Sequence, residues 1–358
     1  ENGWVGPRPP SRRSDRQVAV IGSGPAGLAC AQQLNSAGHQ ITVFERDAQP
    51  GGLLRYGIPD FKLEKHVLQR RLDLMTAEGI RFETGIQAGV DIRGESLRDK
   101  FDALVICCGA TRPRELSIPG RNLKGIHQAM EFLSGQNRVL AGETRALNID
   151  ARGKRVIVIG GGDTGSDCIG TSHRQGAALV VNFELLPQPS DDRPEFQPWP
   201  YWPMRLRTSS SHEEGGARHW NILTQRFLGE NNRISALETV DVRWIEAAGR
   251  PERFEEIPGS QKIWPADLVL LALGFSGPQA DSLAAQLQLK PDDKGTLATD
   301  AGYMTGQAGI FAAGDARRGQ SLIVWAISEG REAARQVDIF LMGHSDLPEK
   351  ACCDLSRV

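Results

Sequence analysis

The chain has 358 residues, of which 40% are hydrophobic and 24% are charged, and its formal net charge is −2. This balance is typical of a globular protein with two domains, and the small charge would attract neither nucleic acid nor an anionic membrane. No apolar run approaches the roughly 20 residues of a membrane span, so we expect no nucleic-acid partner and no membrane partner.

The cysteine spacing indicates no redox or metal site. The six cysteines form no C-x-x-C pair and no iron–sulfur run, so we expect no metal ligands among them. We expect them to pack as small residues in a cytoplasmic protein. The N-terminus shows no secretory signal, and because it is not Met we expect a fragment or a processed product. The cysteines are Cys30, Cys107, Cys108, Cys168, Cys352 and Cys353.

The first third of the chain predicts a βαβ unit. Residues 1–16 are rich in Pro, Arg and Ser and predict an extended linker. Short apolar runs then alternate with a helical pattern, which predicts a parallel sheet. The predicted elements are a strand at Gln17–Ile21, a helix at Pro25–Ala37, a strand at Ile41–Phe44, a helix at Leu63–Ala77 and a strand at Ala103–Cys107.

The same pattern restarts in the middle of the chain and predicts a second βαβ unit. A loop rich in Pro and Trp follows at 186–216, and its role stays open. Strand-like stretches after it predict an antiparallel layer. The predicted strands are Arg155–Ile159, Ala178–Glu184, Trp220–Phe227, Ile234–Trp244, Asp267–Leu273 and Gly309–Ala313, and the predicted helices are Asp163–Gln175 and Ser321–Phe340.

A glycine-rich turn lies between the first strand and its helix. Its residues are Gly22, Ser23, Gly24, Pro25, Ala26 and Gly27. The first glycine permits the tight turn, the second lets the backbone approach a pyrophosphate, and the third lets helix and strand pack closely. The helix N-terminus attracts the phosphates. Glu45 ends the next strand, 23 residues after Gly22, where a carboxylate can accept hydrogen bonds from ribose hydroxyls. The pattern predicts a dinucleotide site.

A second turn of the same kind follows Ile159. Gly160, Gly162 and Gly165 take the three glycine roles, with Asp163 and Thr164 between them, and Glu184 lies 24 residues after Gly160. An acid at this place favours a free ribose 2′-hydroxyl, hence NADH, whereas an arginine would suit the 2′-phosphate of NADPH. Arg174 and Arg193 lie near enough in sequence to leave NADPH open.

A late motif, Gly309 to Gly314-Asp315, resembles the two-dinucleotide flavoprotein oxidoreductases. In that superfamily a late strand ending in Gly-Asp places the Asp on the flavin ribityl chain, and the next helix points its N-terminus at the flavin ring. The resemblance gives Asp315 the first role and Leu322–Trp325 the second. A helix N-terminus there would stabilise the anionic reduced flavin. FAD is therefore expected on the first turn and the nicotinamide dinucleotide on the second.

Longer segments resemble the glutamate synthase small (beta) subunit. They are residues 51–59, 161–168 and 318–330, and the resemblance extends from about Gly3 to Leu347. It implies hydride transfer from NAD(P)H to FAD and onward delivery to a large subunit in glutamate biosynthesis. Members of that family carry an N-terminal domain with two iron–sulfur clusters, which we do not expect in this chain.

Residues and domains follow from these resemblances. We expect an α/β fold of two Rossmann-like domains, with an NAD(P) domain at 122–297 inserted into a discontinuous FAD domain at 17–121 and 298–358. Because the flavin carries the chemistry, no side chain is assigned a catalytic role. The expected cofactor-binding residues are Gly22, Ser23, Gly24, Pro25, Ala26, Gly27, Glu45, Arg46, Gly52, Leu53, Gly57, Ile58, Gly109, Gly160, Gly162, Asp163, Thr164, Gly165, Glu184, Gly274, Gly314, Asp315, Ser321, Leu322 and Val324.

Two other functions fit the same residues. One is a stand-alone NAD(P)H reductase that acts on ferredoxin or a small molecule. The other is a non-enzymatic scaffold whose nucleotide pockets only stabilise the protein. A thioredoxin-reductase function is disfavoured, because it needs a dithiol at the flavin and the chain has no C-x-x-C pair.

Overall fold

The computed structural model describes residues 3–193, 195, 205–206, 208–247 and 250–350. It divides into two compact units, each built around a parallel sheet. Within the described residues, the first unit comprises residues 3–113 and 275–350, and the second comprises Arg114–Gly274. Along the chain, the second unit is inserted into the first, as the sequence predicted.

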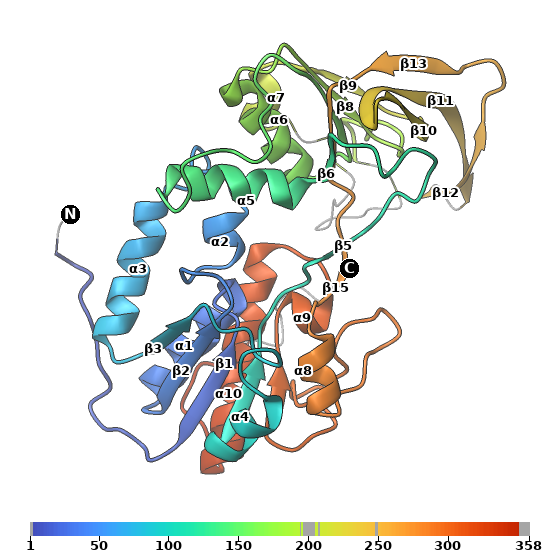
Figure 1. Cartoon of the computed structure of the whole chain (residues 1–358). Helices are drawn as coiled ribbons and strands as arrows, with labels where there is room; N and C mark the ends of the chain where they lie inside the picture. Colours follow the sequence, from blue (N-terminus) through green and yellow to red (C-terminus); the bar gives the residue numbers. More distant parts are fainter. Residues whose placement is uncertain (1–2, 194, 196–204, 207, 248–249, 351–358) are drawn as a thin grey trace. The chain divides into compact units, whose positions relative to one another are not determined.

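The first unit contains a five-stranded sheet in the order β16-β4-β1-β2-β3, with parallel pairing throughout. Helices α1 and α10 pack side by side (Figure 1). The elements are β1 (Gln17–Ile21), α1 (Pro25–Ser36), β2 (Gln40–Glu45), α2 (Leu53–Tyr56), α3 (Lys65–Ala77), β3 (Arg81–Thr84), α4 (Gly94–Lys100), β4 (Ala103–Ile106), β5 (Arg112–Pro113), β15 (Phe275–Gly277), α8 (Asp281–Gln286), β16 (Ile310–Ala312), α9 (Asp315–Arg318) and α10 (Ile323–Met342).

Strand β1 is buried on both faces, which explains its continuous apolar sequence. Val18 and Val20 pack in a core with residues of α1, α3 and α10. Ala19 and Ile21 pack in a second core with residues of α4 and α8. The short apolar run in the sequence is therefore a central strand between two helical layers.

The second unit repeats this plan and adds an antiparallel layer. Its parallel sheet has the order β6-β14-β7-β8-β9, and a separate antiparallel sheet joins β10, β11, β12 and β13. The elements are β6 (Ile126–Gln128), α5 (Ala129–Leu140), β7 (Arg155–Ile159), α6 (Asp163–Gln175), β8 (Leu179–Phe183), α7 (Ser210–Glu213), β9 (Ala217–His219), β10 (Ile222–Glu230), β11 (Arg233–Ala247), β12 (Arg250–Glu256), β13 (Lys262–Pro265) and β14 (Leu268–Leu271).

Alternate residues of β7 also face two cores. Val156 and Val158 pack with residues of α5 and α6. Ile157 and Ile159 pack with residues of the antiparallel layer. The predicted antiparallel layer is thus present, and it covers the sheet face opposite the helices.

The observed division falls earlier in the chain than the predicted crossings at Asn122 and Ala298. The chain leaves the first unit after Pro113 and returns at Phe275, where β5 and β15 pair antiparallel. Packing explains the difference. Leu116 and Ile118 contribute to a core of the second unit, whereas Leu283 contributes to a core of the first. A strand of two or three residues has no sequence period that could reveal it.

Within the described residues, no helix is long and apolar enough to cross a membrane.

Candidate functional site

At both ends of the first glycine-rich turn, backbone contacts leave no room for a side chain. A Cβ at Gly22 would lie 2.5 Å from the Cys107 carbonyl oxygen, and one at Gly27 would lie 1.9 Å from the Gly22 carbonyl oxygen. At Gly24, the N-cap of α1, a Cβ would meet nothing within 4 Å. The turn is therefore tight at its ends and open at its centre, at the N-terminus of a helix where a phosphate group would fit.

Glu45 binds back to this turn. The Ser23 N–H donates to Glu45 Oε2 at 3.0 Å, and the Ser23 hydroxyl donates to the same oxygen. The Asp47 N–H donates to Oε1 at 2.9 Å. Only 5% of Glu45 is exposed. The predicted acid and the predicted turn are thus brought together, and hydrogen bonds fix the carboxylate at the end of β2.

The loop after β2 also reaches the turn. A Cβ at Gly52 would lie 2.9 Å from the Gly24 Cα, and the Gly51 N–H donates to the Ser23 hydroxyl at 2.8 Å. Three further predicted residues lie on or beside α2. Leu53 begins this helix and is 40% exposed, Gly57 caps it, and the Ile58 N–H donates to the Leu53 carbonyl. Elsewhere in the first unit, Arg46 Nη1 donates to the Gln279 side chain, and Gly109 follows β4 with a positive φ.

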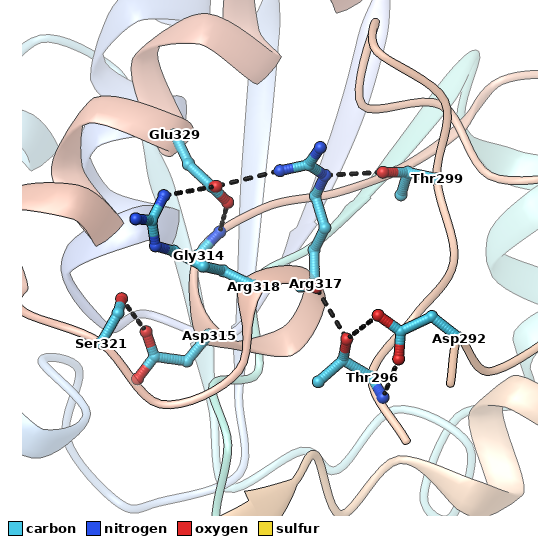
Figure 2. Close-up of polar contacts among 9 residues, drawn as sticks. All are labelled: Asp292, Thr296, Thr299, Gly314, Asp315, Arg317, Arg318, Ser321 and Glu329. Atoms are coloured by element: carbon cyan, nitrogen blue, oxygen red, sulfur yellow. Dashed lines mark hydrogen bonds and ion pairs between the residues drawn. The ribbon is translucent and has the colours of Figure 1, made fainter. Parts of the chain in front are cut away.

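The late Gly314-Asp315 turn lies against α1, the helix that follows the first glycine-rich turn. A Cβ at Gly314 would lie 2.6 Å from the Ala26 Cβ, so the late turn and the start of α1 are in direct contact. The Ser321 hydroxyl donates to Asp315 Oδ1 at 2.8 Å (Figure 2). Burial raises the pKa of the Asp315 carboxyl above its ordinary value. Leu322 caps α10, and Leu322 and Val324 are 48% and 60% exposed.

The second glycine-rich turn repeats the geometry of the first. A Cβ at Gly160 would lie 2.2 Å from the Ala272 carbonyl oxygen, and one at Gly165 would lie 2.3 Å from the Gly160 carbonyl oxygen. At Gly162, the N-cap of α6, a Cβ would again meet nothing within 4 Å. Asp163 and Thr164 form the first turn of α6. Gly274 lies after β14 with a positive φ, and its carbonyl accepts the Arg114 N–H.

Glu184 forms an ion pair that the sequence did not reveal. Arg218 Nη2 lies 3.1 Å from Glu184 Oε1, and the two side chains are 15% and 16% exposed. The Arg218 guanidinium stacks over the Trp220 ring at 4.8 Å. The Glu184 carboxyl carbon lies 1.8 Å from where a Cβ of Gly161 would be. Arg218 comes from β9, which pairs with β8, so its link to Glu184 depends on sheet topology and not on sequence spacing.

Of the two arginines considered from sequence, Arg174 pairs with a different acid. Arg174 is on α6 and forms an ion pair with Glu214. Arg193 is exposed, in the part of the 186–216 loop that the structure describes. Residues 194, 196–204 and 207 of that loop lie outside the described residues, as do Cys352 and Cys353, and the described end of the loop contains α7.

Three of the described thiols are not activated for chemistry. Burial raises the pKa of Cys30 and of Cys107, and it raises the pKa of Cys108 to about 11. A thiol with a raised pKa stays protonated and is a weak nucleophile. Among the described residues, no group of three or more His, Cys, Asp or Glu side chains could hold a metal ion.

Comparison with known proteins agrees with this geometry. The family model described as pyridine nucleotide-disulphide oxidoreductase matches residues 16–198 and 225–330. The glutamate synthase [NADPH] small chain of Mycobacterium tuberculosis is 52% identical over 97% of this chain and 71% of its own length. That of Bacillus subtilis is 45% identical over 97% and 72%. The glutamate synthase [NADH] of Saccharomyces cerevisiae is 46% identical over 97% of this chain and 17% of its own length.

Solved structures with lower identity share the fold. FprA of Mycobacterium tuberculosis, in complex with NADPH, has a TM-score of 0.71 at 18% identity, over 94% of this chain and 85% of its own. Thioredoxin reductase of T. acidophilum has a TM-score of 0.61 at 18% identity, over 90% and 98%.

The predicted fold class and the predicted enzyme class are confirmed. The chain is an α/β protein with two Rossmann-like domains and an FAD-dependent oxidoreductase that uses a nicotinamide dinucleotide in glutamate biosynthesis. It belongs to the glutamate synthase small-chain family, within the pyridine nucleotide-disulphide oxidoreductases.

Proposed function

We propose that the first unit holds FAD, that the second holds NADH in preference to NADPH, and that the electrons pass to a large glutamate synthase chain in the cytoplasm. The observation that carries this proposal is the duplicated turn: each unit has a helix N-terminus beside a glycine with open space in front of it. When bound, the flavin would take a hydride from the nicotinamide and release electrons singly.

The late Gly-Asp turn supports FAD in the first unit. Asp315 is half-buried, and its turn touches the start of α1 through Gly314 and Ala26. An acid there can accept hydrogen bonds from ribityl hydroxyls while α1 binds the pyrophosphate. In the second unit the strand at the corresponding sheet position is β6, and α5 follows it directly at Ala129, with no Gly-Asp turn between them. The two turns are thus alike in backbone and differ in what lies next to them.

The Glu184 carboxylate supports NADH in the second unit. It lies over Gly161, where it would accept hydrogen bonds from ribose hydroxyls and repel a 2′-phosphate. Arg218 holds the carboxylate in this place. We expect a higher kcat/KM for NADH than for NADPH, and in Glu184→Gln we expect their ratio to fall about tenfold, equivalent to roughly 1.4 kcal/mol. A parent enzyme that prefers NADPH would overturn the preference but not the dinucleotide site.

The large-chain partner is supported by two relatives whose names call them small chains. The test is an anaerobic titration of the FAD-loaded protein with NADH and NADPH, followed by electron delivery to a large chain or to ferredoxin. Bleaching of the flavin is the expected result. Failure to bleach with either nucleotide would favour the scaffold function. Fast turnover with ferredoxin, without association with a large chain, would favour the stand-alone reductase.

A further inference from the structure

Glu329 on α10 is a buried carboxylate without an assigned role. Only 4% of it is exposed. Its Oε2 accepts a hydrogen bond from the Gly314 N–H at 3.1 Å. Its Oε1 lies 2.9 Å from Arg317 Nη1 and 3.4 Å from Arg318 Nη1. Figure 2 shows these three groups converging on the one carboxylate. A charge buried this deeply is unfavourable unless it is paired and hydrogen-bonded, and here it is both.

The Gly314 contact acts on the late turn itself. Gly314 has φ 68° and ψ −151°, a conformation that side chains rarely adopt. On one side it touches Ala26 of α1, and on the other its N–H is bound by Glu329. Because Asp315 is the next residue, the Glu329 carboxylate fixes the backbone that carries the Asp315 side chain.

The two arginines are held in fixed orientations. Arg317 Nε donates to Thr299 Oγ1 at 2.6 Å, and its guanidinium stacks over the Tyr303 ring at 4.5 Å. The Arg318 guanidinium stacks over the Trp325 ring at 4.6 Å. Each planar cation is therefore bound by an aromatic face and by the Glu329 carboxylate, an arrangement that guanidinium groups favour.

The charge of Glu329 reaches Asp315. Burial raises the pKa of Asp315, and the negative charge of Glu329 adds to this rise, whereas Arg318 opposes it. The buried carboxylate thus influences the late turn by geometry and also by charge.

We propose that Glu329 is a positioning residue of the flavin site. Its hydrogen bond from the Gly314 N–H fixes the Gly314-Asp315 turn against α1. Its negative charge neutralises part of the positive charge of Arg317 and Arg318, which limits the positive electrostatic potential at the flavin. The inference rests on the proposed binding of FAD by the first unit. It assigns Glu329 no contact with the cofactor.

Two variants separate position from charge. Glu329→Gln keeps an oxygen for the Gly314 N–H but removes the negative charge. Glu329→Asp keeps the charge but withdraws the carboxylate by one methylene. The matched control is Glu332→Gln, which makes the same charge change three residues further along α10. The measurements on each protein are the dissociation constant of FAD, the midpoint potential of bound FAD and the melting temperature.

We expect Glu329→Asp to weaken FAD binding about tenfold, as expected for one lost hydrogen bond to a charged group. We expect Glu329→Gln to shift the flavin potential to a more positive value, because two cations lose their counter-charge and the reduced flavin is anionic. Glu332→Gln should match the parent in both measurements. If Glu329→Gln does not fold, Glu329→Asp still tests the proposal, since its buried pairs remain charged.

Three results would contradict either this proposal or the proposed function on which it rests. Glu329→Asp with parental FAD affinity would overturn the positioning role, even if the melting temperature fell. Glu329→Gln with parental potential would overturn the electrostatic role. Failure of the parent protein to bind FAD would instead overturn the proposed function, and the two failures are therefore distinguishable.

Discussion

The two glycine-rich turns have similar backbone geometry, but their acids, Glu45 and Glu184, are held by different contacts. In the first turn, the residue after the first glycine is Ser23, which donates two hydrogen bonds to Glu45. In the second turn that residue is Gly161, and the Glu184 carboxylate lies where its side chain would be. The first acid is bound by a neutral hydroxyl, whereas the second is bound by the cation of Arg218. The backbone of the two turns is alike, and the second residue of each turn determines which groups contact the acid.

The largest expected effect comes from breaking the closure of either turn. Gly27→Ala would place a Cβ 1.9 Å from the Gly22 carbonyl oxygen, and Gly165→Ala would place one 2.3 Å from the Gly160 carbonyl oxygen. Both clashes are with backbone atoms, which cannot move without disturbing the strand–helix turn. We therefore expect each change to destabilise its own unit by roughly 3 kcal/mol. Calorimetry checks this; a melting temperature within about 1 °C of the parent would contradict it.

Substitution at the open glycines should separate cofactor binding from folding. Gly24 and Gly162 have φ of −68° and −77°, and a Cβ at either meets nothing within 4 Å. We expect alanine at either position to change stability by less than about 0.5 kcal/mol. Because the new methyl group would occupy the phosphate approach, Gly24→Ala should weaken FAD binding and Gly162→Ala should weaken nicotinamide binding, each by about tenfold or more.

The matched pair of open glycines provides its own control. Gly24→Ala should leave the affinity for a nicotinamide dinucleotide unchanged, and Gly162→Ala should leave FAD affinity unchanged. Calorimetric titration of each variant with each ligand measures both. A reversed pattern, with Gly24→Ala losing the nicotinamide, would exchange the cofactors that we propose for the two units.

A smaller effect is expected where the two turns differ. Gly161→Ala would bring a methyl group onto the Glu184 carboxylate, which must move because it is the flexible partner. We expect kcat/KM for NADPH to rise relative to NADH by a few-fold, since a displaced acid repels the 2′-phosphate less. In the first turn, Ser23→Ala is the matched variant and should leave this ratio unchanged. An unaltered ratio in Gly161→Ala would argue that Glu184 does not select the nucleotide.

The sequence predicted the parts of the fold in which local signals agree. Strands β1 and β7 and helix α6 have the predicted bounds, because each is an apolar run or an amphipathic helix that begins or ends at a glycine. Helix α5 was not predicted, since Gly135 interrupts it, and β3 was not predicted because three of its four residues are exposed and polar. The buried residues of α5, namely Ala129, Phe132, Leu133 and Asn137, do have helical spacing, so its internal glycine hid this helix, whereas β3 lacks an apolar pattern.

The site was predictable to the same extent. The glycines of each turn are neighbours in the chain, and each acid lies at or just after the end of the adjacent strand. Their fixed spacing therefore made them recognisable in the sequence. Arg218 and Glu329 lie 34 residues from Glu184 and 15 from Gly314 respectively, and no sequence period links those pairs. Their contacts follow from sheet pairing and from the packing of α10 against α1.

The smallest expected effect concerns a feature that both units share at the opposite end of the central strands. Asp267 accepts a hydrogen bond from the backbone N–H of Arg155 at 3.0 Å. It also accepts two from the Arg155 guanidinium, one from Nε and one from Nη2. Asp102 likewise accepts the Gln17 N–H at 2.8 Å but binds the neighbouring Arg16 only once. The hydrogen bonds from Arg155 lower the pKa of Asp267 to about 2.

A lowered pKa in the folded state stabilises the protein above the unfolded pKa of about 3.9, and this stabilisation is lost as the pH falls toward 2. Because the two side chains are 42% and 39% exposed, solvent screening limits the effect to about 0.5–1 kcal/mol. We therefore expect Asp267→Asn to lower the unfolding free energy at pH 7 by this amount and to match the parent near pH 2, with a smaller loss at pH 7 in Asp102→Asn. Denaturant unfolding at several pH values measures the difference, and a constant gap between parent and Asp267→Asn down to pH 2 would show that the ion pair is not its source.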